Sequence, residues 1–177
     1  VADGFTSSDP EYKMVAAILS QSPRVESVAV NIRDSDDTIA DAMDELRETH
    51  DDWYIFMITE RDSTTLHAAG TWAESVEKIF IGCCSAISAL NERNGLREAY
   101  LIHNDAANFP EAAWVGSAVP YAIGSVSWKW RTPAGVTASN FTLTELNQIR
   151  AGNGQTLSKR SGVVYSNEGK MTGGQFI

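Results

Sequence analysis

Three short apolar runs, at residues 53–59, 78–84 and 99–103, alternate with stretches of helical periodicity in the first 105 residues. Apolar runs of this length are typical of strands that are covered on both faces. A further run rich in valine and isoleucine, at residues 25–32, predicts another strand earlier in the chain. Strands joined by helices form parallel sheets through right-handed crossovers. Residues 10–105 are therefore predicted to form a three-layer α/β unit with a mostly parallel sheet.

Local capping signals and apolar spacing predict the helices. Asp9 is a suitable cap and Pro10 a suitable first residue for a helix that ends at Ser22-Pro23. A second helix is expected to be capped within residues 35–37, because the apolar residues that follow recur at helical spacing. Further helices are predicted from residue 62 to 73, from 86 to 93, from 110 to 119, and from Thr142 or Thr144 to Ile149.

The last third of the chain follows a different, α+β pattern. Proline and glycine interrupt it repeatedly, and residues 125–130 alternate as a strand would, with Val126, Trp128 and Trp130 on one face. Residues 162–166 and 171–177 predict a terminal β-hairpin joined by residues 167–170. We therefore divide the chain into an α/β portion, residues 1–108, and a C-terminal α+β portion, residues 109–177, predicted to pack together as one compact unit.

Charge is distributed unevenly along the chain. Residues 1–120 carry 21 acidic and 8 basic side chains, whereas residues 121–177 carry 2 and 6, so that net charges of −13 and +4 give the overall −9. An acidic body repels phosphate, which argues against nucleic-acid binding. No apolar run approaches the roughly 20 residues of a membrane helix, so membrane insertion is not predicted. The charge division suits either a solvated acidic surface or a basic tail that meets the acidic body of a neighbour.

Nucleotide-binding patterns are incomplete. The first strand–helix junction, residues 32–37, has three aspartates and no glycine, so a bound phosphate would face carboxylates instead of free N–H groups. Gly169-Lys170 matches half of a P-loop, but Met171 replaces the Ser or Thr, and Val164 stands where the earlier glycine belongs. No cofactor is predicted.

Other candidates for chemistry have structural explanations. The aspartates within residues 34–37 suit a divalent metal, but helix capping accounts for them as well, and no metal site is predicted. His103 ends a strand at the edge where α/β sheets bind ligands, yet no nucleophile pattern accompanies it. Cys83 and Cys84 lie in an apolar strand and are predicted to be core residues. We predict no catalytic residues and no enzymatic activity.

Several short segments carry a resemblance that spans nearly the whole chain through their order and spacing: residues 21–24, 51–54, 72–74, 112–116, 124–129, 135–136 and 168–177. Together they resemble the tail sheath proteins of contractile-tailed phages. The resemblance marks seven candidate assembly positions, Trp114, Gly116, Gly124, Trp128, Gly135, Gly169 and Gly173. Trp114, Trp128 and Trp130 are expected to act as exposed anchors for a neighbouring subunit.

The resemblance implies a structural subunit that stacks as hexameric rings around a tail tube. Its partners would be copies of itself, the tail tube protein, the baseplate and the tail terminator. It would fold in the host cytoplasm, become part of the virion tail, and contract to drive the tube through the host envelope. Family members carry further terminal parts, so a piece of a longer chain is expected. Alternatives are a small-molecule or flavin-binding α/β domain, another tail or injection-machine component, or a related bacteriocin or secretion sheath.

Overall fold

A parallel sheet forms the centre of the protein in the computed structural model, which describes residues 4–122 and 124–177. Its strands are β1 (Ile55–Phe56), β2 (Ile79–Cys84) and β3 (Glu98–Ile102), in the order β1-β2-β3. β2 and β3 pair over five residues, from Phe80 opposite Glu98 to Cys84 opposite Ile102, whereas β1 and β2 pair over two. The predicted α/β fold with a mostly parallel sheet is confirmed.

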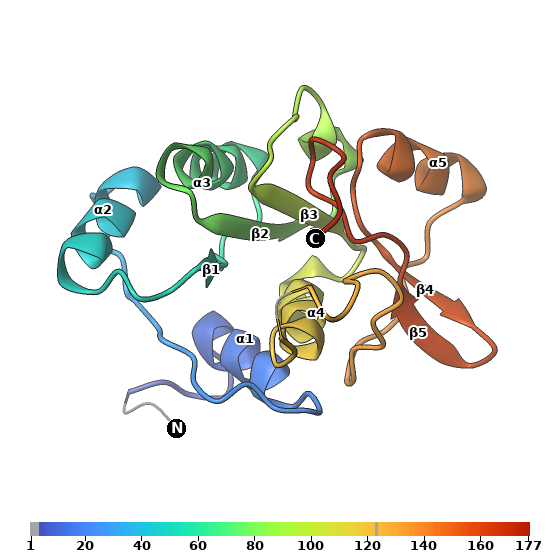
Figure 1. The fold of residues 1–177 in the computed structure, drawn as a ribbon, viewed down its shortest axis with the longest axis horizontal. Coiled ribbons are helices and arrows are strands. Elements are labelled where there is room, and N and C mark those ends of the chain that lie inside the picture. The colour runs from blue at the N-terminus through green and yellow to red at the C-terminus, as the bar shows by residue number, and fades with distance from the viewer. Residues whose placement is uncertain (1–3, 123) are drawn as a thin grey trace.

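Helices cover both faces of this sheet (Figure 1). α2 (Ile39–Thr49) and α3 (Ser63–Val76) lie on one face, where they share a core with Phe80 and Tyr100. α4 (Pro110–Ala118) lies on the other face, where it packs against Ile81 and Leu101. Neighbouring residues of one strand thus enter opposite cores, as the two-residue period of a strand requires. α1 (Pro10–Leu19) packs on α4 and forms a further layer.

Local capping explains where the helices begin. Pro10 begins α1 as predicted and Asp9 occupies the N-cap position, but the Asp9 side chain accepts from the Thr6 N–H and makes no capping hydrogen bond to the helix. The Asp62 carboxylate accepts a hydrogen bond of 2.8 Å from the Thr65 N–H and caps α3. The cap of α2 lies after residues 35–37, the range in which it was predicted. Thr38 caps this helix in a reciprocal arrangement with Asp41, in which each side chain accepts a hydrogen bond from the other's backbone N–H.

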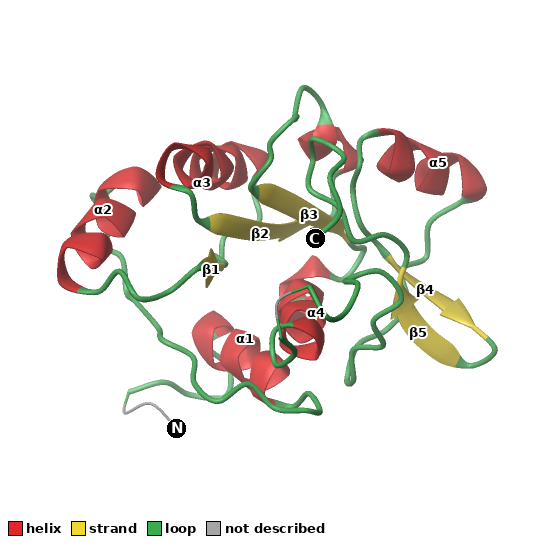
Figure 2. Ribbon diagram, in the orientation of Figure 1, coloured by secondary structure: helices red, strands yellow, loops and turns green. Residues whose placement is uncertain are grey.

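The C-terminal portion also contains α5 (Leu143–Ala151), β4 (Leu157–Arg160) and β5 (Val163–Ser166), and a long loop leads from α4 to α5 (Figure 2). It continues the hydrogen bonding of the sheet at β3. The Gln155 N–H donates to the Tyr100 carbonyl, and the Ile102 N–H donates to the Gln155 carbonyl, both at 2.8 Å. Leu157 enters the same core as α4. The C-terminal portion is therefore packed against the α/β portion through backbone and side chains.

The predicted strand at residues 25–32 is wrong. This segment is extended but joins no sheet, and it crosses the surface between α1 and α2. Val25 and Val28 pack inward, whereas Ile32 is 74% exposed. Valine and isoleucine favour a strand where their side chains pack against a neighbouring strand, and among the described residues no strand pairs with this segment. The predicted helix at residues 86–93 contains only a short 3-10 helix, η1 (Ile87–Leu90).

Two strand predictions in the C-terminal portion are also wrong. Residues 125–130 form turns, and Trp130 has a left-handed φ of 66°, so the alternation of Trp128 and Trp130 places one inside and the other outside. A hairpin does form, but residues 163–166 are its second strand and not, as predicted, its first. β5 pairs with β4 through a turn at Ser161 and Gly162, which have φ values of 50° and 85° as such tight turns require. Residues 171–177 form no strand.

Candidate functional site

Trp114 and Trp128 join α4 to the C-terminal segment, which we define as residues 121–177. The Trp114 side chain is fully buried, and its indole N–H donates to the Trp128 carbonyl at 3.0 Å. The two rings meet edge to face with centroids 5.3 Å apart. The expectation that these residues are exposed anchors is therefore wrong for both, because they are part of the core. Trp130 alone of the three is exposed, at 57%.

Three of the candidate glycines lie where two parts of the chain approach closely. A Cβ on Gly116 would lie 2.6 Å from the Ile18 carbonyl oxygen of α1, and one on Gly169 would lie 2.5 Å from the Lys129 nitrogen. A Cβ on Gly173 would lie 2.9 Å from the Gly95 carbonyl oxygen. These distances are too short for any side chain, so these glycines permit contacts within the chain.

The other two candidate glycines, Gly124 and Gly135, occupy exposed turns. Their φ values of 75° and 77° lie in the left-handed region, which glycine adopts without steric cost. No other described residue lies within 4 Å of a Cβ built at either position. The seven candidate positions therefore shape the C-terminal segment and fasten it to the rest of the molecule, whereas none of them forms an exposed aromatic surface.

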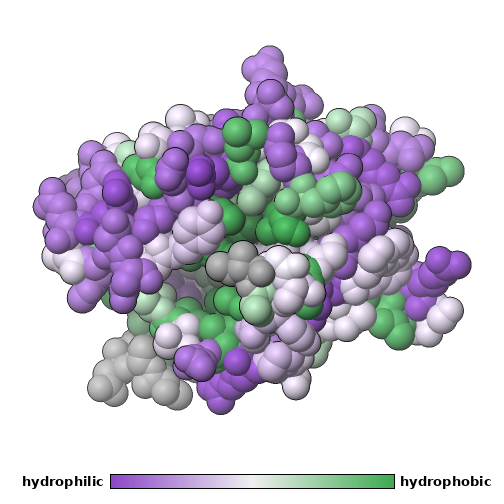
Figure 3. Space-filling model, viewed as in Figure 1, coloured by the Kyte–Doolittle hydropathy of each residue, from purple (hydrophilic) through white to green (hydrophobic). Residues whose placement is uncertain are grey.

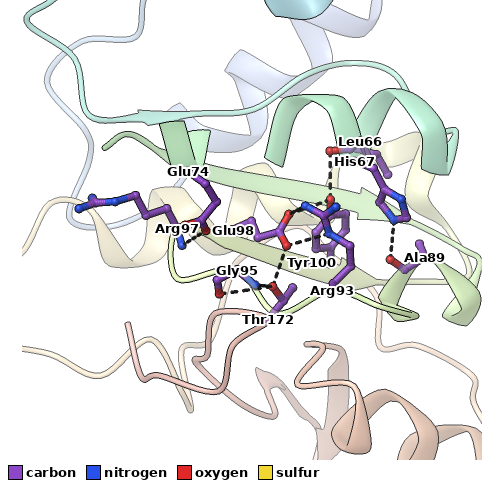
Figure 4. A network of polar contacts seen from close by, with 10 residues as sticks. All are labelled: Leu66, His67, Glu74, Ala89, Arg93, Gly95, Arg97, Glu98, Tyr100 and Thr172. Carbon is purple, nitrogen blue, oxygen red and sulfur yellow. Dashed lines mark hydrogen bonds and ion pairs between the residues drawn. The ribbon is translucent and has the colours of Figure 1, made fainter. Parts of the chain in front are cut away.

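A polar network at the start of β3 holds the end of the C-terminal segment (Figure 4). Glu98 is fully buried at its centre. The Arg93 guanidinium donates to both Glu98 carboxylate oxygens, with a distance of 2.8 Å from Nε to Oε1. The Thr172 hydroxyl donates to Oε1 at 2.8 Å, and the Tyr100 hydroxyl lies 3.2 Å from Oε2. We call Glu98, Arg93, Tyr100 and Thr172 the Glu98 clamp.

Backbone contacts reinforce the Glu98 clamp. The Gly95 N–H donates to the Thr172 hydroxyl at 2.7 Å, and the Gly173 N–H donates to the Gly95 carbonyl at 2.7 Å. The Thr172 N–H donates to the Glu98 carbonyl at 2.8 Å. Gly70 of α3 leaves room for the carboxylate, since a Cβ there would overlap Glu98 Oε2. The clamp thus joins α3, β3 and the C-terminal segment at one point.

The electrostatics of the Glu98 clamp favour a fixed protonation state. Burial raises the pKa of Tyr100, and the negative charge of Glu98 raises it further, so the hydroxyl keeps its proton and remains a donor. The cluster was not predictable from the sequence, because Thr172 lies 74 residues after Glu98. The one available signal was Glu98 itself, a charged residue that directly precedes an apolar strand.

The three candidates for chemistry lie apart from the Glu98 clamp. Among residues 4–122 and 124–177, no three His, Cys, Asp or Glu side chains are grouped so as to hold a metal ion, and Asp34 and Asp36 are exposed in a turn before α2. His103 is buried beside a shallow pocket of about 380 Å³ at the carboxyl end of β3. Its Nε2 contacts the Thr137 carbonyl at 3.0 Å, and its Nδ1 accepts from the Asp105 N–H at 3.0 Å, so both ring nitrogens are bonded.

The cysteines lie beside a buried ion pair at the carboxyl end of β2. Cys83 and Cys84 are both free and buried. Burial raises the pKa of the Cys83 thiol well above its ordinary value, and the carboxylate of Glu111 adds to this effect. Glu111 is fully buried, and its Oε1 lies 2.6 Å from the Arg61 guanidinium. A protonated, buried thiol is a poor nucleophile, so this arrangement suits packing.

Comparisons of this chain with family models, with curated proteins and with solved structures give no match. Among the described residues, no helix has the length and apolar character needed to cross a membrane. The geometry of the C-terminal segment is therefore the observation on which a functional proposal has to rest, together with the sequence resemblance.

Proposed function

We propose that this chain is a structural subunit of a contractile phage tail sheath. One observation carries the proposal. Three segments that share the resemblance, residues 112–116, 124–129 and 168–177, lie far apart in sequence and pack together in the fold. Trp114 bonds to Trp128, Gly169 packs against the backbone of Trp128, and the Ile177 N–H donates to the Gly169 carbonyl at 2.8 Å. Similar segments that pack into one structural unit support relatedness to the sheath proteins better than similar segments dispersed over the fold would.

The way in which the C-terminal segment is fastened suits a protein that carries mechanical load. The Trp114–Trp128 contact holds its beginning and the Glu98 clamp holds its end, near Thr172. The bridge at Gln155 joins its middle to β3. A force applied near Ile177 would therefore reach the central sheet through buried contacts. In a sheath this path would transmit the contraction of the lattice, whose stored energy replaces nucleotide hydrolysis.

The proposed partners follow from this role. Copies of the chain would form stacked hexameric rings around the tail tube protein, between the baseplate and the tail terminator, in the virion. A flavin or another small molecule in the pocket beside His103 is the alternative that this fold class favours, because ligands of α/β sheets bind at the carboxyl ends of the strands. The hydrogen bonds at both nitrogens of His103 leave the ring no free position toward such a ligand.

Electron microscopy separates these proposals. The chain should be expressed with whatever residues flank it in its natural reading frame and concentrated. We expect hollow, transversely striated cylinders. Stable small rings or monomers at high concentration would instead indicate another component of a tail or injection machine. A rise in melting temperature on addition of flavin mononucleotide would indicate the small-molecule alternative and contradict a purely structural role.

A further inference from the structure

The β4–β5 ribbon presents an aromatic and apolar face to solvent. In its register Arg160 lies opposite Val163 and Ser158 opposite Tyr165, so these four residues share one face. Val163 is 51% exposed. The Tyr165 ring packs against the exposed Trp130 ring, with centroids 4.9 Å apart and the ring planes tilted by 32°. The opposite face of the ribbon contributes Leu157 and Val164 to the core. The outer face is therefore the unburied half of a two-sided element.

The exposed tip of the ribbon is also positively charged: Arg160 lies on this outer face, whereas Lys159, opposite Val164, lies on the other face. Lys159 and Arg160 at the end of β4 are exposed and have no ion pair among the described residues. The Lys129 ammonium lies 5.1 Å from the centre of the Trp130 ring and is paired with Glu168 at 3.2 Å. We call Trp130, Lys159, Arg160, Val163 and Tyr165 the ribbon end.

The surface with the opposite charge lies on α2 and the loops on either side of it. Ile39 and Ala42 face the core, and the acidic side chains on the other sides of the helix are exposed, with Asp44 also accepting a hydrogen bond of 2.9 Å from the Trp72 indole N–H. Exposed carboxylates follow one another along this part of the chain, at Asp34, Asp36, Asp41, Asp44, Glu45, Glu48 and Asp52. We call these residues the acidic end.

The two ends lie at opposite extremes of the long axis of the molecule, with α2 on the left and the β4–β5 ribbon on the right (Figure 1). Hydrophilic residues cover the α2 extreme, whereas hydrophobic and hydrophilic residues are mixed at the ribbon extreme (Figure 3). A single copy cannot bring the two ends together, because the central sheet lies between them. A second copy can satisfy both, through a contact in which different surfaces of two identical chains meet.

We infer that copies of this chain associate head to tail, with the ribbon end of one copy bound to the acidic end of the next. Such a contact generates rings or helical arrays, since each copy keeps one free surface of each kind. The inference deepens the proposed function by naming the surfaces through which subunits meet, and it rests on that proposal for the larger assembly. Exposed charges are screened beyond about 8–10 Å, so the association is weak and sensitive to salt.

A charge exchange between two variants tests the contact. One variant carries Lys159→Glu and Arg160→Glu, and the other carries Glu45→Lys and Glu48→Lys. At about 20 mM salt, sedimentation equilibrium should show self-association of each variant weakened on the order of tenfold relative to wild type. An equal mixture of the two variants should recover the wild-type association, because every reversed surface then meets a surface of opposite charge.

A matched variant controls for net charge. Lys13→Glu with Arg24→Glu lowers the net charge by the same amount as Lys159→Glu with Arg160→Glu, at two exposed positions away from both ends, and should leave association unchanged. Equal weakening by this variant, failure of the mixture to recover association, or no association of wild type at about 20 mM salt would each overturn the inference. Cylinders that form normally despite the reversed charges would overturn it while leaving the sheath proposal intact. Recovery of association in the mixture, with no cylinders formed, would support this inference and contradict the sheath proposal.

Discussion

Glu98 shows how a buried charge can fasten one part of a chain to another. An unpaired buried carboxylate costs several kcal/mol, whereas Arg93, Thr172 and Tyr100 surround this one with donors. Of these donors, Thr172 comes from the C-terminal segment, and its hydroxyl also accepts a hydrogen bond from Gly95. At the scale of single residues, the Thr172 hydroxyl is therefore, among the described residues, the one side-chain group of the C-terminal segment that hydrogen-bonds with the Glu98 carboxylate.

Replacing Thr172 with valine should lower the free energy of unfolding by about 1–3 kcal/mol, because it leaves the Gly95 N–H without its acceptor and removes one of the two donors to Glu98 Oε1. Urea denaturation measures the change. Thr172→Ser is the matched control, since it keeps the hydroxyl and loses one methyl group, for a cost of about 1 kcal/mol. Equal losses in the two variants would show that packing of the methyl group, and not the hydroxyl, holds this segment.

A second prediction at this scale concerns the pH dependence of stability. Burial raises the pKa of Glu111 above its ordinary value of 4.5, an effect that the Arg61 charge opposes. The folded chain thus keeps the Glu111 proton to higher pH than the unfolded chain does. The contribution of Glu111 to the unfolding free energy is therefore complete below pH 4.5 and decreases as the pH rises through the raised pKa.

Glu111→Gln removes this titration and serves as its reference. Urea denaturation of both proteins from pH 4.5 to about pH 8 should show the wild type losing stability relative to the variant as the pH rises. A difference that stays constant or grows over this range would show that the Arg61–Glu111 ion pair keeps the carboxylate charged in the folded chain.

At the scale of elements, the contact between α1 and α4 depends on the absence of a side chain. Gly116 of α4 lies against the Ile18 carbonyl of α1, and the Gln21 side chain continues the contact by binding the Ala134 backbone at both its carbonyl and its N–H. α1 is thereby fixed to α4 and to the C-terminal segment at once.

Gly116→Ala should separate the two helices and lower the free energy of unfolding by about 1–3 kcal/mol, although alanine favours a helix more than glycine does. Amide hydrogen exchange in α1 should become faster. Gly124→Ala provides the comparison, because its cost comes from a left-handed φ of 75° and no described atom lies in the way. Unchanged exchange in α1 of the Gly116 variant would mean that the helices adjust without separating.

Elements whose signals are local were predictable from the sequence, whereas those that depend on distant partners were not. Pro10 and Asp62 marked the starts of α1 and α3 correctly, because a first-turn proline and a capping carboxylate both act within one helical turn. Residues 25–32 have strand propensity but reach no strand to pair with, so propensity alone misled. The pairing of β5 with β4 depends on the turn at Ser161 and Gly162, whereas the sequence predicted Gly162 as the first residue of a strand.

The sequence marks the candidate assembly positions as unusual residues but does not show which residues they contact. Glycine and tryptophan stand out in composition at Trp114, Gly169 and Gly173, yet the sequence does not tell whether a close contact lies within one chain or between two. The structure places these contacts within the chain. The outer face of the ribbon was missed because β4 was not predicted, and Trp130 was grouped with two buried tryptophans.

At the scale of the whole molecule, the protein combines rigid internal fastening with two ends of unlike charge. The C-terminal segment is bound at Trp128, Gln155 and Thr172, and the acidic and ribbon ends lie at opposite extremes of the long axis. A rigid body with complementary ends is suited to repeated addition of identical copies. In the proposed sheath, contraction would shift whole subunits relative to one another while each subunit keeps its fold.

The dimensions of assembled particles test the contractile sheath most directly. The chain with its natural flanking residues should be imaged by electron microscopy before and after mild heating, and the length and diameter of each cylinder measured. We expect two discrete states, with the heated cylinders shorter and wider than the starting ones and built from subunits of unchanged fold. Cylinders of a single fixed diameter in both conditions, or particles that never form cylinders, would contradict the proposal.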